Sequence, residues 1–110
     1  MLVAFSVAPS GTGRADGSVH DAVAAAVRIV RDSGLPHRTT SMFTEIEGEW
    51  DEVFAVVRSA TDAVGAYGSR VSLVLKADIR PGWTGELDGK LERLEAAIAD
   101  GESSRDDDAS

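Results

Sequence analysis

Alternating apolar and polar positions are clearest in residues 70–79, which we predict to form a strand. One set of positions there is apolar throughout and the other mixes apolar and charged side chains, so one face belongs to a core. Residues 2–7 are apolar on both faces apart from Ser6, which is typical of a central strand. Two shorter β-prone segments, residues 37–40 and 43–47, are predicted to form a hairpin.

A helical repeat of apolar residues predicts a first helix over residues 18–33. Ser18 and Asp21 stand in the capping-box position at its start, since the two residues are three apart. Gly34 then provides a C-cap, and Pro36 prevents the helix from continuing. The loop before this helix is rich in glycine, but its spacing is not that of a phosphate-binding P-loop, so we interpret it as a flexible connection.

Two further helices are predicted downstream. The second follows Gly48, has acidic residues in its first turn, and carries an apolar stripe of Trp50, Val53, Val57, Ala60 and Val64. We interpret Trp50 as a lid on the core. The third helix runs from residue 85 or 86 to residue 100, and its stripe is narrow: Leu87, Leu91, Leu94 and Ile98.

The predicted order of elements is β-α-β-β-α-β followed by one more helix. This order defines an α+β fold, the ferredoxin-like βαββαβ antiparallel sheet, here with an additional C-terminal helix. We expect residues 1–100 to form a single ferredoxin-like domain. Residues 101–110 are small, polar and charged, so we expect them to be a disordered acidic tail.

Both helices of this fold cover one face of the sheet, which leaves the other face open. On the open face we expect Ala4, Ser6, Phe43, Glu45, Glu47, Val74, Lys76 and Asp78. Antiparallel pairing is expected to bring Glu47 toward Ala4 and Lys76, with Glu45 nearer Ser6. The face mixes apolar and charged residues, which indicates an interface: either the sheets of two subunits meet there, or a neighbour's third helix covers it.

Two interpretations of the carboxylates on the open face stay open. They can form ion pairs at a subunit contact, with Glu47 and Lys76 as the expected pair. They can instead bind a cationic ligand. The net charge of −8, from 19 acidic and 11 basic residues, argues against a nucleic acid or an anionic membrane as partner. The same charge is compatible with a small cation, or with solubility alone.

Composition excludes several other classes. The chain has no cysteine, so disulfides and thiolate chemistry are excluded. No apolar run approaches the roughly 20 residues that span a bilayer, and residues 1–7 lack a basic segment before them, so we expect a soluble, cytoplasmic protein. His20 has no second ligand at metal-binding spacing, so we expect no metal site.

Four stretches resemble a known family. They are Phe5-Ser-Val-Ala-Pro9; Ser33-Gly-Leu35; Thr44-Glu-Ile-Glu-Gly48 with Glu49, Asp51, Glu52 and Val53 after it; and Ile79-Arg80. On these residues the chain resembles the small thiamine-binding proteins, the YkoF-like family, over residues 1 to about 100. The sequence departs from the family pattern in residues 11–17 and 40–43, and ligand specificity could differ if either segment borders the site.

The resemblance implies a ferredoxin-like protomer in a homo-oligomer, with dimers assembling to tetramers. It implies binding of thiamine or of its hydroxymethylpyrimidine half, with no catalysis and no other cofactor. A carboxylate could meet the charged thiazolium, a hydroxyl could bind the pyrimidine, and an aromatic ring could stack. The candidate ligand-binding residues are Ser6, Phe43, Thr44, Glu45, Glu47 and Lys76.

Two alternatives stand beside ligand binding. One is a small ferredoxin-like enzyme, of the isomerase or monooxygenase type, with Glu45 or Glu47 as its base. The other is a purely structural oligomerisation module, in which the same carboxylates serve assembly alone.

Overall fold

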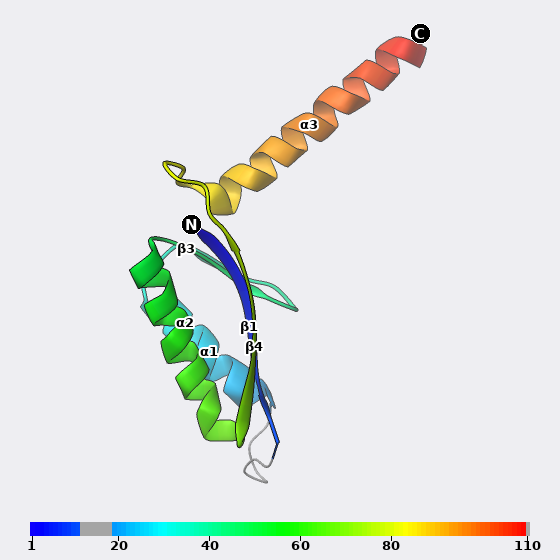
Figure 1. Ribbon diagram of the computed structural model, residues 1–110. Helices are drawn as coiled ribbons and strands as arrows, with labels where there is room; N and C mark the ends of the chain where they lie inside the picture. The colour runs from blue at the N-terminus through cyan, green and yellow to red at the C-terminus, as the bar shows by residue number, and fades with distance from the viewer. Residues whose placement is uncertain (12–18, 110) are drawn as a thin grey trace.

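The computed structural model describes residues 1–11 and 19–109, with side chains described as far as Gly101. The elements follow the predicted order (Figure 1). They are β1 (Leu2–Ser10), α1 (Val19–Asp32), β2 (His37–Thr39), β3 (Thr44–Glu47), α2 (Trp50–Val64), a short 3-10 turn (Gly65–Tyr67), β4 (Arg70–Asp78) and α3 (Glu86–Ala109). The predicted capping box at Ser18 and most of the glycine-rich loop lie outside the described residues.

The four strands form one antiparallel sheet in the order β2-β3-β1-β4. Helices α1 and α2 lie side by side on one face of that sheet (Figure 1). This is the ferredoxin-like arrangement, so the predicted fold class is confirmed. Gly34, the expected C-cap of α1, has a φ of 76°, which is the left-handed conformation that glycine adopts most readily.

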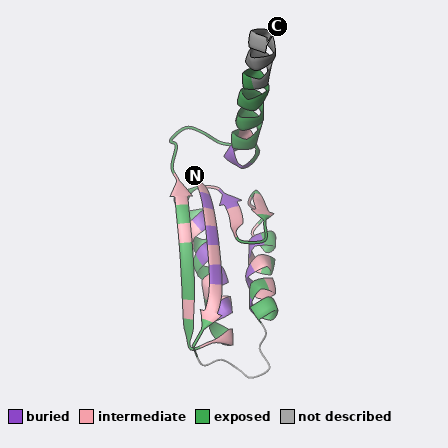
Figure 2. Cartoon of the chain, turned by 90° about the vertical axis from the view of Figure 1, so that its right-hand side faces the viewer, coloured by how far each residue is buried: buried purple, intermediate pink, exposed green. Residues whose placement is uncertain are grey.

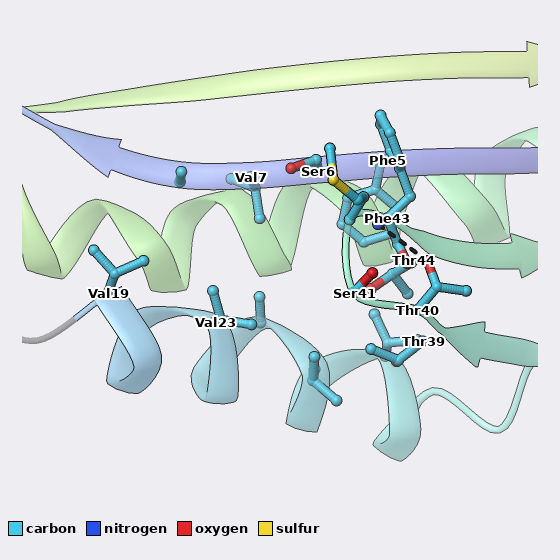
Figure 3. A pocket seen from close by; sticks show the side chains of 15 residues that line it. Phe5, Ser6, Val7, Val19, Val23, Thr39, Thr40, Ser41, Phe43 and Thr44 are labelled. Atoms are coloured by element: carbon cyan, nitrogen blue, oxygen red, sulfur yellow. Dashed lines mark hydrogen bonds between the residues drawn. The ribbon is translucent and has the colours of Figure 1, made fainter.

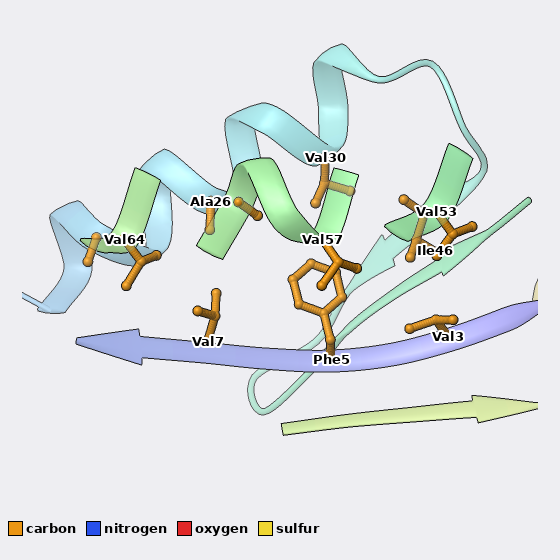
Figure 4. Close-up of a cluster of buried hydrophobic side chains, with 11 residues drawn as sticks. Val3, Phe5, Val7, Ala26, Val30, Ile46, Val53, Val57 and Val64 are labelled. Carbon is orange, nitrogen blue, oxygen red and sulfur yellow. The ribbon is translucent and has the colours of Figure 1, made fainter. Parts of the chain in front are cut away.

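The core lies between the sheet and the two helices (Figure 4). Alternate β1 side chains point into it, because successive residues of a strand face opposite sides. They meet Ile46 and the inner faces of both helices; the set is Val3, Phe5, Val7, Ala22, Ala26, Val30, Ile46, Val53, Val57, Ala60 and Val64. Trp50 does not cover this core: it is 52% exposed and stacks on Phe54, with ring centroids 5.2 Å apart. The interpretation of Trp50 as a lid was wrong because the helix begins at this residue, outside the packed layer.

The strand register differs from the expected one by two residues. Glu47 lies opposite Leu2, which in turn lies opposite Asp78. Glu45 takes the place expected for Glu47, opposite Ala4 and across that residue from Lys76. A shift of two residues leaves the side chains of β3 on their predicted face. The predicted faces are therefore right, whereas the predicted β1 neighbours of Glu45 and Glu47 are wrong. The expected pair of Glu47 and Lys76 does not form.

The third helix leaves the body of the molecule (Figures 1 and 2). Its first turn contacts β3, and the rest extends past the end of the sheet. The helix continues to Ala109 rather than ending near Asp100, because no proline interrupts the segment and Gly101 is accommodated in the helix. The division into a domain of residues 1–100 and a disordered tail stays a prediction. Within the described chain, no helix is both long and apolar enough to cross a membrane.

Candidate functional site

An opening at the edge of the sheet results from unequal strand lengths. β1 pairs with β4 along its whole length, from Leu2 to Ser10, but it pairs with β3 only from Leu2 to Phe5. Beyond Phe5, β1 therefore has no strand partner on the β3 side among the described residues. Backbone N–H and C=O groups on that side are strong hydrogen-bonding groups that a strand would otherwise pair.

A cavity of about 260 Å³ occupies this opening (Figure 3). It lies between β1, the inner face of α1 and the turn that joins β2 to β3. Its lining combines hydroxyl groups on the sheet and turn with apolar side chains from the helix and the strand. The residues are Phe5, Ser6, Val7, Ala8, Val19, Val23, Ala26, Val27, Val30, Thr39, Thr40, Ser41, Met42, Phe43 and Thr44.

The turn at the cavity is held by its own hydrogen bonds. The Thr40 backbone N–H and the Thr40 Oγ1 hydroxyl both donate to the Phe43 carbonyl oxygen, each over 2.9 Å. The Phe43 backbone N–H donates back to Thr40 Oγ1 over 3.3 Å. Side chains that bond to nearby backbone in this way stabilise turns. These hydrogen bonds therefore hold the turn in one conformation, in which Phe43 and Thr44 line the cavity.

The candidate residues from the sequence divide into two groups. Ser6, Phe43 and Thr44 line the cavity together, although they come from β1 and the turn before β3 (Figure 3). Glu45, Glu47 and Lys76 do not line it. The described lining residues include no charged side chain and no histidine. The cavity thus presents neutral hydrogen-bonding groups and apolar surface, and the expected carboxylates lie elsewhere.

Glu47 binds the first backbone N–H groups of α3 through its carboxylate. Its side chain is only 7% exposed, and its carboxylate lies at the start of α3. Glu47 Oε2 accepts a hydrogen bond from the Glu86 backbone N–H over 2.8 Å, and Oε1 accepts one from the Leu87 N–H over 3.3 Å. The first N–H groups of a helix have no partner within the helix, and a carboxylate also complements the helix dipole. Glu47 is therefore an N-terminal cap supplied by a distant strand.

Glu45 and Lys76 lie on the open face, separated by Ala4 of the central strand. Neither side chain makes an ion pair within the described part of the chain. Arg38, which lies opposite Glu45 on β2, instead pairs with Asp88 of α3 over 2.5 Å. The central part of the open face thus carries unpaired charges of both signs.

A second ion pair fixes the other side of α3. Lys90 of α3 donates to Asp78 at the end of β4. The hydrogen bond from Lys90 and its positive charge lower the pKa of Asp78, with smaller contributions from Lys76 and Arg80. Both partners are substantially exposed, so the pair orients the helix more than it stabilises the fold.

Sequence reasoning missed Thr39 and the apolar face of α1 as parts of the cavity wall. A signal was present, because residues 39–41 form a run of hydroxyl side chains, and residues 40–43 depart from the family pattern. In the structure, residues 40–43 line the cavity. His20 and His37 lie outside the lining, and His37 Nδ1 lies 2.9 Å from the Leu35 carbonyl oxygen. Among the described residues, no group of side chains could hold a metal ion.

The fold and the cavity define a small ferredoxin-like α+β protein with an uncharged opening beside its central strand. Residues 3–95 match the family described as Thiamine-binding protein, and the chain belongs to that family. A UPF0045 protein of Mycobacterium bovis is 51% identical over 96 residues, which cover 86% of this chain and 91% of that protein.

Solved structures of similar proteins share the fold. A hypothetical protein of Methanocaldococcus jannascii superposes with a TM-score of 0.74 at 28% identity, over 86% of this chain and 94% of the other. A domain of unknown function, DUF77, from Bacillus cereus superposes with a TM-score of 0.68 at 31% identity, over 77% of this chain and 82% of the other.

Proposed function

We propose that this protein binds thiamine through its hydroxymethylpyrimidine half, in the cavity beside β1, without catalysing a reaction. The family supports a thiamine-related role. The observation that carries the proposal is the edge of β1 that lacks a strand partner among the described residues, next to a hydroxyl-lined, uncharged cavity. No other ligand or cofactor enters the proposal.

The chemistry of the aminopyrimidine matches that edge. An amino group beside a ring nitrogen offers one donor and one acceptor side by side, as a peptide backbone does. Such a group can bond to the strand where β3 stops, in the manner of an added strand. Ser6 and Thr44 add hydroxyls that can donate or accept, and Phe43 adds an aromatic face.

The size and charge of the cavity support a particular placement of the two halves of thiamine. Sites for drug-sized ligands span about 300–1,000 Å³. The 260 Å³ here falls just below that range, which suits one heteroaromatic ring and its substituents. Burying the positive thiazolium without a partner would be costly, and the described lining offers no carboxylate. We therefore propose that the neutral pyrimidine lies inside the cavity, with the thiazolium toward solvent.

The same lining supports binding rather than catalysis. General acid–base chemistry needs a titratable group within hydrogen-bond reach of the substrate. Glu47 is occupied by two N–H groups of α3, and Glu45 lies outside the cavity, so the geometry gives no support to either as a base. That the protein is not an enzyme stays a prediction, as does its cytoplasmic location.

Calorimetric titration with thiamine and with free hydroxymethylpyrimidine tests the proposal. We expect Thr44→Val to weaken both ligands by about 3- to 10-fold, because a neutral hydrogen bond contributes about 0.5–1.5 kcal/mol. The variant keeps the shape of the side chain and suits a strand. Glu45→Gln, one residue further along β3 but outside the cavity, is the matched control and should bind as the wild type does.

Two outcomes would reject the proposal. If neither ligand binds at millimolar concentration, the protein is not a thiamine-binding module of this kind, and the structural alternative gains support. If Glu45→Gln loses binding and Thr44→Val keeps it, the ligand lies on the open face of the sheet, as the charges in the sequence first indicated.

A further inference from the structure

Three large apolar side chains that line the cavity are also exposed to solvent. Val19 and Val23, on α1, are 59% and 41% exposed, and Met42, in the turn between β2 and β3, is 73% exposed. Figure 3 shows Val19 and Val23 pointing from α1 toward β1. Exposed apolar side chains that gather at one opening are typical of a binding site. The mouth of the cavity is therefore apolar and open in the free protein.

Met42 has both the position and the flexibility to cover this mouth. Among the described residues, no large hydrophobic side chain is more exposed. Met42 lies in the short connection between Thr40 and Phe43, whose hydrogen bonds hold the backbone in place. Its side chain is unbranched and has three rotatable bonds, so the thioether can move while the backbone stays fixed. Sulfur also packs favourably against aromatic rings, so the side chain can close over a ring in the cavity.

The same thioether is open to oxidation. Hydrogen peroxide transfers one oxygen atom to the sulfur: the O–O bond breaks, a sulfur–oxygen bond forms, and the rest of the peroxide leaves as water. The sulfur is oxidised by two electrons and the peroxide is reduced by two. The product, methionine sulfoxide, is polar and chiral. A sulfoxide that covers a ring beside Val19 and Val23 would lose water, and these valine side chains offer no hydrogen bond in exchange.

The rest of the chain makes this reaction selective. The sequence contains two methionines and no cysteine, so no thiol competes for the peroxide. The other methionine, Met1, is half-buried and packs against the core. Its backbone is held to Gly48 by two hydrogen bonds, of 3.0 and 3.1 Å. Peroxide should therefore reach Met42 before Met1.

We propose that Met42 is an oxidation site that controls the cavity. Its thioether covers the bound ligand, and conversion of the thioether to the sulfoxide weakens binding. This control rests on the function proposed above, because the ring that Met42 covers is the hydroxymethylpyrimidine. The modification is reversible, since methionine sulfoxide is reduced back to methionine by dedicated reductases.

Calorimetric titration with hydroxymethylpyrimidine, before and after mild treatment with hydrogen peroxide, tests the proposal. Mass spectrometry of the intact protein and of its peptides should place one added oxygen atom on Met42. We expect the oxidised protein to bind about 5- to 30-fold more weakly, because a polar group buried without a hydrogen bond is costly. Reduction by a pair of reductases, one for each sulfoxide epimer, should restore the affinity.

Met42→Leu is the matched control, because it keeps an apolar side chain of similar volume and removes the sulfur. The comparison is made within the variant, whatever its own affinity: peroxide should leave that affinity unchanged. Met1 is still present, so an equal loss in Met42→Leu would show that oxidation acts elsewhere and would overturn the proposal. Urea denaturation should give the same free energy of unfolding for the oxidised and the untreated wild type, since Met42 lies outside the core.

Protection by the ligand gives a second readout. A saturating concentration of hydroxymethylpyrimidine should slow the oxidation of Met42 and leave that of Met1 unchanged, because the ligand holds only the first thioether against a ring. An equal rate of Met42 oxidation with and without the ligand would overturn the proposal, as would oxidation of Met1 before Met42.

The two proposals fail in different ways. If the untreated protein does not bind hydroxymethylpyrimidine, the proposed function and the control by Met42 are rejected together. If the untreated protein binds it and the Met42 sulfoxide binds it equally well, the cavity is the site but Met42 does not control it.

Discussion

Glu47 shows how the bonding partners of one side chain can be missed by sequence alone. Its place on a strand beside Glu45 indicated a ligand contact or an ion pair with Lys76. In the structure it caps a helix whose first residue lies 39 positions downstream. A contact across that distance depends on the assembled fold, and no local pattern around Glu47 contains it. The charge was recognised correctly, but its partner was two backbone N–H groups.

Removing this cap should loosen α3 from the body. We expect Glu47→Ala to lower the free energy of unfolding by about 0.5–2 kcal/mol, the range for loss of an N-terminal cap. Hydrogen exchange should accelerate at the amides of Glu86 and Leu87, which lose their acceptor. Urea denaturation and amide exchange followed by NMR measure the two effects.

Glu45→Ala is the control for this change, because it removes a carboxylate from the same strand without touching α3. Exchange at Glu86 and Leu87 should remain slow in that variant. Equal protection of the two amides in Glu47→Ala and in the wild type would show that the cap does not hold the helix.

At the scale of elements, hydrophobic periodicity predicted which segments form strands and helices and which faces they bury. It could not determine the register of β3, because pairing shifted by two residues leaves the same side chains on the same face. The turn at residues 40–43, whose hydrogen bonds depend on Thr40, aligns β3 with β2. The pairing of β3 with β1 joins segments that lie far apart in the sequence, so no local pattern determines it. The end of α3 was also missed, because the apolar stripe stops at Ile98 while the helical backbone continues.

The ion pair between β4 and α3 gives a prediction for pH. Since Lys90 lowers the pKa of Asp78 in the folded state, the pair's stabilising effect is present above the ordinary carboxyl pKa. The effect is lost as the pH falls through the lowered pKa. We expect Lys90→Ala to raise the pKa of Asp78 toward its ordinary value, as measured by NMR titration of the side-chain carboxyl.

Lys76→Ala is the comparison for this titration, because Lys76 acts on Asp78 by charge alone and contributes less than Lys90. Its removal should raise the pKa of Asp78 by less. High salt should reduce the effect of both lysines, since the groups are exposed to solvent. A pKa for Asp78 that does not respond to Lys90→Ala would contradict the pairing.

At the scale of the whole molecule, the candidate site results from a difference between two strands. Ser6, Phe43 and Thr44 could be selected from the sequence as possible contacts, and the structure brings them together. The cavity itself could not be predicted, because it forms where β1 extends beyond the end of β3 and α1 lies beside the edge of β1 that is left. The charged residues were attractive candidates because thiamine is a cation, but the described residues that line the cavity carry no charged side chain.

A ligand that binds the folded cavity should raise the free energy of unfolding, because it does not bind the unfolded chain. With hydroxymethylpyrimidine at about 100 times its dissociation constant, we expect the free energy of unfolding to rise by about 2.7 kcal/mol. The rise should be smaller in Thr44→Val at the same ligand concentration, as measured by chemical denaturation, because that variant loses a hydroxyl that lines the cavity. An equal rise in the two proteins would show that the Thr44 hydroxyl does not contact the ligand.

The attachment of α3 by a single turn makes the helix a long lever arm. A tilt of 10° at the Glu47 carboxylate would sweep the far end through roughly 6 Å, given an arm of about 36 Å. A spin or fluorescent probe near the C-terminal end of α3 would therefore move much farther than the residues at the end of β3, so that small rearrangements there become easier to detect. In this fold the most sensitive place to observe the sheet is the point farthest from it.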